Sequence, residues 1–495
     1  MLYQTRYTTS RLILSIMLIA GLARAQTKME APNDSSLKEI VKVELAGDDA
    51  VSAHLIDVSA DNGIVELSGT VNDLLSKDRA EKIVESLKGV RAIRNKLEVR
   101  PVERTASEIR NDVQMALLVD PVTELFELSV GARGDTVILE GRVQSLAEKE
   151  LVTKVVKNVK GIRHIYNNVD VVPKLVRSNL EIREEVQERL KNDPYVREEM
   201  IDVKVKSGVV SLSGTTGSLS EKAFAHNDAL VMGVSEINDD KLDVELWAES
   251  PLRKEAKSIV KSGEKIKKDL QAVFKNSPRL ADAEIDIDVK KGAVTLKGNV
   301  DNLAAKRLAE HAALDVVGVY NVRNALKVRP DEIYEDEEIK ESIAMALQWN
   351  PVVERHEISI DVRNSKAYIY GEVDSRYEKE VAGSVCEEVL GVVDVANYLR
   401  IRRDVEPWNY LGDEVISSNI KGEYYNSWYV DQDDLDIEVE EGVATISGDI
   451  ESKRELNAIV ENAFDGGARA VRTRLDLLGL PDYGYYRYRE YYPLN

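Results

Sequence analysis

One glycine recurs along the chain at nearly constant intervals, and this repetition limits the possible folds more than any local feature does. Its six positions are Gly69, Gly141, Gly214, Gly298, Gly371 and Gly448. A second glycine follows 18 to 20 residues later each time, at Gly89, Gly161, Gly233, Gly318, Gly391 and the Gly466-Gly467 pair. Self-similarity at a fixed period indicates that one structural unit has been copied. We therefore expect six repeat units, numbered 1 to 6 from the N-terminus.

The order of elements inside a unit can be read from unit 4. Apolar residues recur at helical spacing over 266–274, and alternate with period two over 285–289 and again over 294–300. A second helical pattern over 303–317 ends at Gly318, and a last strand pattern follows. The spacing predicts an α+β fold made of a tandem array of six small αββαβ units. Each unit would hold a three-stranded sheet with two helices on one face.

The recurring residues have structural interpretations. The first glycine lies on the buried side of the second strand, where we expect a helix backbone to approach closely. A glycine also occupies most hairpin turns, but Ser365 in unit 5 and Asp135 in unit 2 replace it, so these two turns should differ from the others. Asn95 and its counterparts, six residues after the second glycine, are expected to bond the backbone at a bend.

The repeats give the following organisation. The units are expected at 35–101, 106–173, 177–246, 264–330, 336–403 and 411–479, with a basic linker helix at 250–263 and a tyrosine-rich tail at 480–495. Residues 1–25 resemble a signal peptide, because two arginines precede an apolar run that ends at the cleavage pattern Ala23-Arg24-Ala25. A short buried helix or an uncleaved anchor is the alternative. We expect the protein to be exported. Because no cysteine directly follows the apolar run, we expect it to carry no lipid anchor.

The composition excludes several classes of function. The chain of 495 residues is 43% hydrophobic and 31% charged, which is typical of folded soluble protein. Its net charge of −21 excludes a generally basic nucleic-acid-binding surface. Cys386 is the one cysteine, so no disulfide can form within the chain, and we expect it to pack in a helix. No catalytic motif occurs, so we expect no enzyme, cofactor or metal site.

Two runs of sequence resemble a known family. Residues 63–71 (GIVELSGTV) with 89–99 (GVRAIRNKLEV), and residues 292–300 (GAVTLKGNV) with 318–326 (GVYNVRNAL), are similar to the BON domain of bacterial osmotically inducible and nodulation proteins. The resemblance extends more loosely to the other four units. It implies a non-enzymatic periplasmic protein of the Gram-negative envelope that binds phospholipid or envelope proteins and supports envelope integrity or the osmotic stress response. The alternative is a scaffold that self-associates, or that docks on a channel or fibre, through its sheet edges.

A basic segment could attract anionic lipid. Residues 252–268 contain seven basic and two acidic residues, and Leu252, Ala256 and Ile259 fall at helical spacing. Such a basic amphipathic helix suits a membrane surface. The candidate contacts are Arg253, Lys254, Lys257, Lys261 and Lys265. The alternative is a linker helix that packs on unit 3 or unit 4.

The tail is the second candidate contact. Residues 483–492 hold six of the twenty tyrosines, and tyrosine suits membrane and protein interfaces because its ring is apolar and its hydroxyl is polar. The candidate contacts are Tyr485, Tyr486, Arg487 and Tyr488. A tail that folds onto unit 6, or that is disordered, is the alternative.

Overall fold

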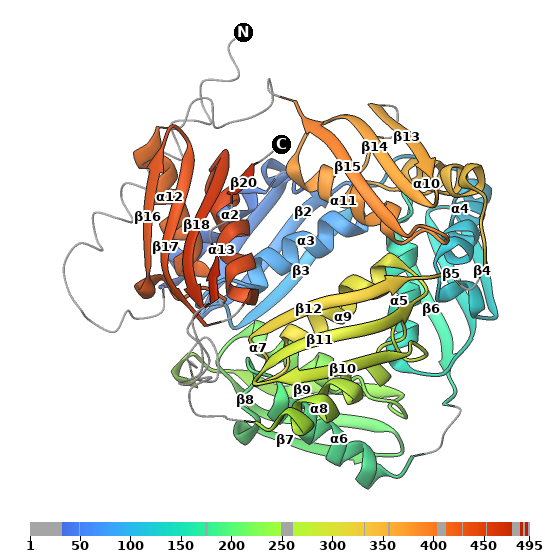
Figure 1. Cartoon of the computed structure of the whole chain (residues 1–495), viewed down its shortest axis with the longest axis horizontal. Coiled ribbons are helices and arrows are strands. Elements are labelled where there is room, and N and C mark those ends of the chain that lie inside the picture. Colours follow the sequence, from blue (N-terminus) through green and yellow to red (C-terminus); the bar gives the residue numbers. More distant parts are fainter. Residues whose placement is uncertain are drawn as a thin grey trace.

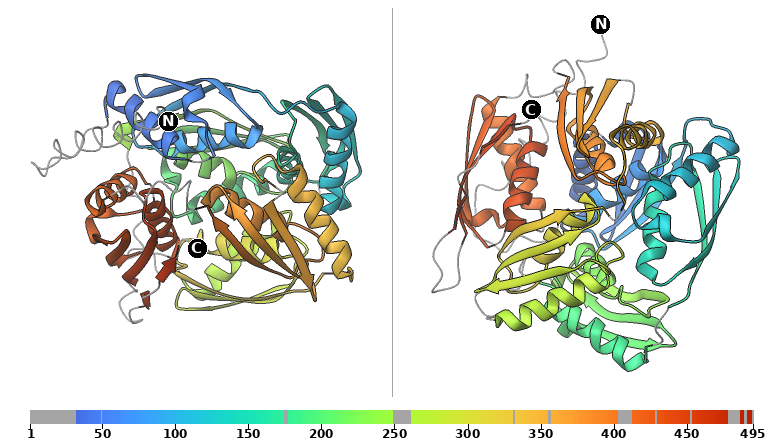
Figure 2. Two further views of the ribbon diagram at one scale, coloured as in Figure 1. Left: turned by 90° about the horizontal axis from the view of Figure 1, so that it is seen from above. Right: turned by 45° about the vertical axis from the view of Figure 1, so that its right-hand side comes forward.

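A computed structural model describes the chain at residues 32–48, 50–173, 177–248, 261–330, 332–354, 357–402, 412–427, 429–451, 453–477, 486–488 and 491–493. The expected signal peptide and most of the expected linker helix lie outside these residues. Figures 1 and 2 show six units of similar build gathered into one compact body. In Figure 1 the sheets of units 2 and 6 lie on opposite sides of the molecule, with one helix of each unit on the inner side.

Unit 1 shows the order that the other units repeat. It consists of α2 (Asp34–Gly47), β1 (Ile56–Asp61), β2 (Ile64–Val71), α3 (Leu74–Glu85) and β3 (Ala92–Val99). β1 and β2 form an antiparallel hairpin, and β3 lies parallel to β2 after the crossover through α3. The predicted α+β fold of six αββαβ units is confirmed.

Units 2 and 3 follow the same order. Unit 2 holds α4 (Ala106–Val119), β4 (Leu128–Arg133), β5 (Thr136–Val143), α5 (Leu146–Lys157) and β6 (His164–Val171). Unit 3 holds α6 (Asn179–Asn192), β7 (Ile201–Lys206), β8 (Val209–Thr216), α7 (Leu219–Asp228) and β9 (Glu236–Val244). The first helices of both units begin at a capping box, in which Thr105 bonds Glu108 and Ser178 bonds Glu181.

The last three units repeat the order again. Unit 4 holds α8 (Gly263–Lys275), β10 (Ile285–Lys290), β11 (Ala293–Val300), α9 (Leu303–Leu314) and β12 (Asn321–Val328). Unit 5 holds α10 (Asp336–Trp349), β13 (Ile358–Arg363), β14 (Lys366–Val373), α11 (Arg376–Glu387) and β15 (Asp394–Ile401). Unit 6 holds α12 (Asp413–Asn426), β16 (Leu435–Glu440), β17 (Val443–Ile450), α13 (Lys453–Asp465) and β18 (Ala470–Leu477).

The repeated glycine has a different role from the one predicted. Gly69 takes a φ of 115°, and a Cβ placed there would lie 2.1 Å from the carbonyl oxygen of Leu55. The backbone that approaches is therefore the residue before the first strand, and not a helix. The same contact recurs in every unit, which explains why no side chain is accommodated at this position.

The hairpin prediction is right for unit 2 and wrong for unit 5. Ser365 and the residue before it, Asn364, both take positive φ, as Asn62 and Gly63 do in unit 1. Both turns therefore have the backbone of a type I′ hairpin. In unit 2 only Gly134 takes positive φ, at the first turn position, as in a type II′ turn.

The repeated asparagine ties the third strand to the second helix. Asn95 donates from Nδ2 to the carbonyl oxygen of Lys77 in α3 over 3.4 Å, and accepts from the backbone N–H of Leu97 over 3.2 Å. The equivalent bonds occur at Asn167, Asn324 and Asn397. The asparagine therefore has a structural role within the unit.

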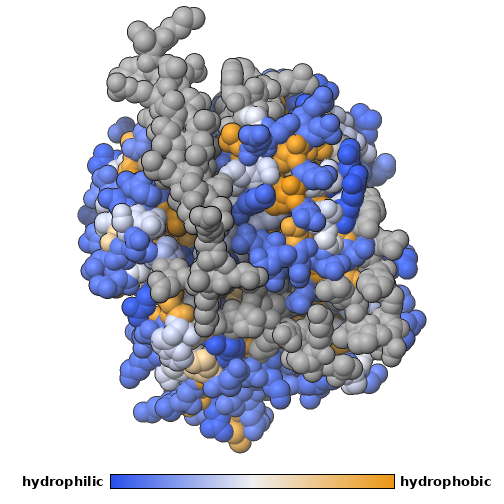
Figure 3. Space-filling view, turned by 90° about the vertical axis from the view of Figure 1, so that its left-hand side faces the viewer, coloured by the Kyte–Doolittle hydropathy of each residue, from blue (hydrophilic) through white to orange (hydrophobic). Residues whose placement is uncertain are grey.

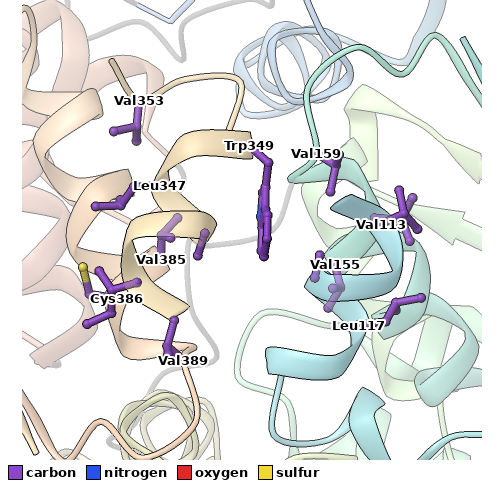
Figure 4. Packing of buried hydrophobic residues seen from close by; sticks show 14 of the residues in the cluster. Val113, Leu117, Val155, Val159, Leu347, Trp349, Val353, Val385, Cys386 and Val389 are labelled. Carbon is purple, nitrogen blue, oxygen red and sulfur yellow. The ribbon is translucent and has the colours of Figure 1, made fainter. Parts of the chain in front are cut away.

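Units 2 and 5 share a single hydrophobic core. Figure 4 shows Trp349 of α10 standing between the helices of the two units, with Val155 and Val385 on either side. The backbone N–H of Lys160 donates to the Trp349 carbonyl oxygen over 2.7 Å, and that of Leu390 donates to the Val119 carbonyl oxygen over 3.2 Å. Because these are corresponding positions in the two units, the pair has local two-fold symmetry.

The remaining units are also joined in pairs, by hydrogen bonds near the ends of their first helices. The backbone N–H of Val317 in unit 4 donates to the carbonyl oxygen of Asn192 in unit 3 over 2.8 Å, and that of Met232 in unit 3 donates to Oδ1 of Asn276 in unit 4 over 2.8 Å. Asn426 of unit 6 donates to Glu44 of unit 1. The first unit thus pairs with the sixth, the second with the fifth and the third with the fourth.

Units 1, 2 and 3 also form a ring, held by the first residue of each second helix. Leu74 of unit 1 packs on the joint core of units 2 and 5, Leu146 of unit 2 packs on unit 3, and Leu219 of unit 3 packs on unit 1. This head-to-tail order closes on itself. It gives the first half of the chain approximate three-fold symmetry.

Units 4, 5 and 6 form the corresponding second ring through ion pairs between second helices. These pairs are Arg307 with Glu387 at 2.5 Å, Arg376 with Asp465 at 3.8 Å and Lys453 with Glu310 at 2.7 Å. Two stacked rings joined by three local two-fold axes make a pseudo-hexamer of approximate 32 symmetry within one chain. The helix faces are buried by this arrangement.

Candidate interaction surfaces

No group of three or more His, Cys, Asp or Glu side chains that could hold a metal ion occurs among the described residues. In the same residues, no helix is long and apolar enough to cross a bilayer. On the face shown in Figure 3, the coloured residues are mostly hydrophilic, with hydrophobic ones in small patches. Cys386 is buried in the joint core of units 2 and 5, as predicted.

The structure describes two of the five basic-segment candidates, and both have acidic partners. Nζ of Lys261 lies 2.6 Å from Oδ1 of Asn192 and 3.1 Å from Oδ2 of Asp269. Burial lowers the pKa of Lys261, while the Asp269 carboxylate opposes that shift. Lys265 pairs with Asp269 at 2.9 Å and also with Glu188. These two lysines therefore help to join unit 4 to unit 3.

The other three basic candidates, Arg253, Lys254 and Lys257, lie outside the described residues. The linker helix predicted at 250–263 is described only from residue 261, and α8 begins at Gly263. The membrane-contact hypothesis for this segment therefore rests on its sequence.

The tail adds strands to unit 6. β19 (Tyr486–Tyr488) and β20 (Tyr491–Pro493) both run antiparallel to β18, with Tyr486 opposite Leu477 and Tyr488 opposite Leu475. Together with Arg487, these tail residues extend the three-stranded sheet to five strands. The tail thus folds onto unit 6, which was one of the two alternatives. The candidate Tyr485 lies outside the described residues.

The junctions between units carry several titratable groups. Burial raises the pKa of Glu387 to about 7, against the opposing effect of Arg307 across the junction of units 4 and 5. His226 in unit 3 bonds Asp239 over 3.1 Å and faces Glu150 of unit 2 at 3.9 Å. The hydrogen bond to Asp239, together with the nearby Glu150 carboxylate, raises the pKa of His226 to about 9.

A buried glutamate near the start of the second helix was missed by the sequence reasoning. The carboxylate of Glu378 accepts the backbone N–H of Glu354 over 2.7 Å and that of Asp374 over 2.9 Å. Glu455 makes the equivalent bonds in unit 6, and burial raises its pKa to about 7. The sequence does contain a signal for this glutamate, namely the spacing of a capping box. Each of the two glutamates stands three or four residues after a polar residue that precedes the helix.

A cleft of about 770 Å³ lies between units 1 and 2. Basic side chains from both units line this 1–2 cleft, namely Lys77, Arg100, Lys157, Arg163 and His164. Asp78 and Glu98 are the acidic residues of its wall. Its volume falls within the range of ligand-binding sites in proteins. The sequence reasoning did not find it, because its walls come from two different units.

Comparison with known proteins places these features in a family. The model of the BON domain matches residues 33–101, 105–173, 178–245, 262–330, 335–403 and 412–477. Osmotically-inducible protein Y of Escherichia coli K12 is 25% identical over 195 residues, which span 33% of this chain and 97% of that protein.

Two solved structures of CdsD, a structural protein of the type III secretion system of Chlamydia trachomatis, also match. The C-terminal domain is 10% identical with a TM-score of 0.12, and covers 43% of this chain and 100% of its own. The second structure is 8% identical with a TM-score of 0.11, and covers 40% and 88%. Scores this low carry no inference about function.

Proposed function

Because the chain belongs to the BON-domain family, we propose that it is an exported, non-enzymatic protein of the Gram-negative envelope that binds phospholipid surfaces. In this proposal it is periplasmic after removal of residues 1–25, and it supports envelope integrity during osmotic stress. The observation that carries the proposal is the sixfold repetition of a BON unit whose helix faces are buried between units, which leaves sheet faces and edges to meet partners. Similarity to an osmotically inducible protein favours the stress role.

Within this proposal, the basic segment supplies the first lipid contact. Each lysine or arginine close to an anionic membrane contributes about 1 kcal/mol of attraction. Lys261 and Lys265 are held by Asp269, so the contact falls to Arg253, Lys254 and Lys257. Changing only these three residues leaves the described contacts of Lys261 and Lys265 between units 3 and 4 in the sequence.

Vesicle flotation tests the proposal. The full chain is mixed with vesicles of phosphatidylglycerol and phosphatidylethanolamine over a series of salt concentrations. We expect binding that weakens with salt, and at least about tenfold weaker binding when Arg253, Lys254 and Lys257 are all changed to Glu. The control changes Lys290, Lys297 and Lys327, which are exposed on unit 4, to Glu. Absence of flotation of the unmodified chain at any salt concentration would contradict lipid binding.

Assembly through sheet edges is the second candidate function. The observation that favours it is the addition of β19 and β20 to the outer edge of β18, which shows that this edge of a unit accepts an extended strand. In the described residues of the other five units, the third strand is the last strand of its sheet. Light scattering separates the two functions, because a chain that stays monomeric at high concentration speaks against self-assembly.

A further inference from the structure

At one junction of the first ring, an ion pair joins two residues whose counterparts can be identified in the other units by their place in the repeat. Where unit 3 meets unit 1, Nη2 of Arg91 lies 2.9 Å from Oε1 of Glu245, and Nε of Arg91 donates to the carbonyl oxygen of Val244 over 3.0 Å. Arg91 stands two residues after the second glycine of unit 1. Glu245 follows the third strand of unit 3. The pair ties the two units together.

At the junction of units 1 and 2, the same two positions are both arginine. Arg163 stands two residues after Gly161, as Arg91 does after Gly89. Arg100 corresponds to Glu245, because the backbone N–H of each bonds the carbonyl oxygen of the last residue of its second strand, over 2.8 and 2.9 Å. Both arginines line the 1–2 cleft. A like-charged pair therefore stands where the sister junction has an ion pair.

The third junction shows that the fold does not require charged residues at these two positions. Where unit 2 meets unit 3, the corresponding residues are Val172 and Ser235, which are uncharged. The repeated unit thus tolerates an ion pair, a neutral pair or two arginines at this place. Two arginines near one opening repel each other unless an anion lies between them.

The partners of the basic residues leave positive charge in the cleft. Lys157 pairs with Asp78 at 2.6 Å, and Arg163 pairs with Asp135 at 3.0 Å while its side chain stays 46% exposed. Lys77 donates to the carbonyl oxygen of Leu97 over 2.8 Å, a neutral partner. Arg100 is 69% exposed and lies 3.7 Å from Glu98, which is itself 74% exposed.

We propose that the 1–2 cleft binds a phosphate group, which bridges Arg100 and Arg163. A phosphate would supply the negative charge that Glu245 supplies at the junction of units 3 and 1. Its oxygens also match the donor geometry of guanidinium groups. Lys77 lies in the wall of the same cleft and supplies a further cation. The phosphate belongs either to a phospholipid headgroup or to a soluble phosphate compound. Only the headgroup version rests on the proposed lipid function.

Calorimetric titration of the full chain with inorganic phosphate, at constant ionic strength, tests the site. The key variant is Arg100→Glu, which copies the Arg–Glu pair of the sister junction and should keep the fold. We expect it to weaken phosphate binding about tenfold or more, since a charge-assisted contact is lost and a repelling carboxylate is added. Arg323→Glu, an exposed change on unit 4, is the matched control and should bind as the unmodified chain does. Equal binding by Arg100→Glu, or no phosphate binding by the unmodified chain, would overturn the proposal.

Vesicle flotation of the same variants identifies the source of the phosphate. Loss of flotation by Arg100→Glu together with loss of phosphate binding supports a lipid headgroup. Unchanged flotation together with lost phosphate binding supports a soluble phosphate compound. In a further outcome, the unmodified chain binds phosphate but does not float with vesicles, and the Arg100→Glu variant loses phosphate binding. This outcome would contradict the lipid function and would support the phosphate site in the 1–2 cleft.

Discussion

The backbone N–H of Lys160 donates to the carbonyl oxygen of Trp349 over 2.7 Å, and so joins the second unit of the chain to the fifth. This bond belongs to an interface in which helices of both units contribute to one core. Isolated units of about 70 residues bury little apolar surface and are marginally stable. Pairing supplies the apolar contacts that one unit lacks.

Removal of the Trp349 side chain should therefore destabilise two units at once. Trp349 is 6% exposed, and we expect Trp349→Ala to cost about 3 to 5 kcal/mol of unfolding free energy. Trp247 is 73% exposed, so Trp247→Ala should change stability by less than about 0.5 kcal/mol. Denaturant unfolding followed by circular dichroism measures both variants. Equal effects of the two changes would contradict the shared core.

The repeated glycine should not accept a methyl group. In Gly298→Ala the new Cβ would lie 2.2 Å from the carbonyl oxygen of Glu284, and φ is 120°. We expect a loss of about 1 to 3 kcal/mol, because alanine rarely takes this conformation. Gly422 lies in α12 with no atom within 4 Å of an added Cβ, so Gly422→Ala should stabilise by about 1 kcal/mol. Thermal unfolding distinguishes the signs, and stabilisation by Gly298→Ala would refute this reading of the repeat.

The six repeated glycines and the alternating strand patterns were enough to predict the fold of the repeat unit. This is because the pattern reflects contacts that each unit makes within its own roughly 70 residues. The approach of Leu55 to Gly69 was not predicted, since a sequence shows that space is needed but not what fills it. The pairing of Lys160 with Trp349 joins residues that are far apart in sequence, and the local periodicity is the same whichever units pair. The 1–2 cleft escaped prediction for the same reason.

The buried carboxyl group at the junction of units 4 and 5 should make stability depend on pH. Burial raises the pKa of Glu387 to about 7 in the folded chain, against an ordinary value of 4.5. The folded state then binds more protons than the unfolded state between these values, so stability falls as pH rises from 5 to 7, by about 2 kcal/mol. Glu387→Gln should remove this share of the pH dependence, while Glu440→Gln, an exposed change, should leave the pH dependence as it is. An identical pH profile for Glu387→Gln would contradict the prediction.

His226 should titrate far above an ordinary histidine. The hydrogen bond to Asp239 and the ion pair with Glu150 raise its pKa to about 9, so the charged imidazole joins units 2 and 3 at neutral pH. Its contribution to stability is complete below pH 6.5, the ordinary value, and is lost as pH rises through 9. NMR titration of the ring protons measures this midpoint. Glu150→Gln should lower the midpoint, and a midpoint near 6.5 in the unmodified chain would contradict the junction.

Small-angle X-ray scattering tests most directly whether the six units form one body. For a compact chain of this length we expect a radius of gyration of about 23 Å, since units 1, 2 and 3 are closed into a ring and paired with units 6, 5 and 4. A string of six independent units would instead give a radius roughly twice as large. The smaller value supports the paired rings, and the larger value would contradict them.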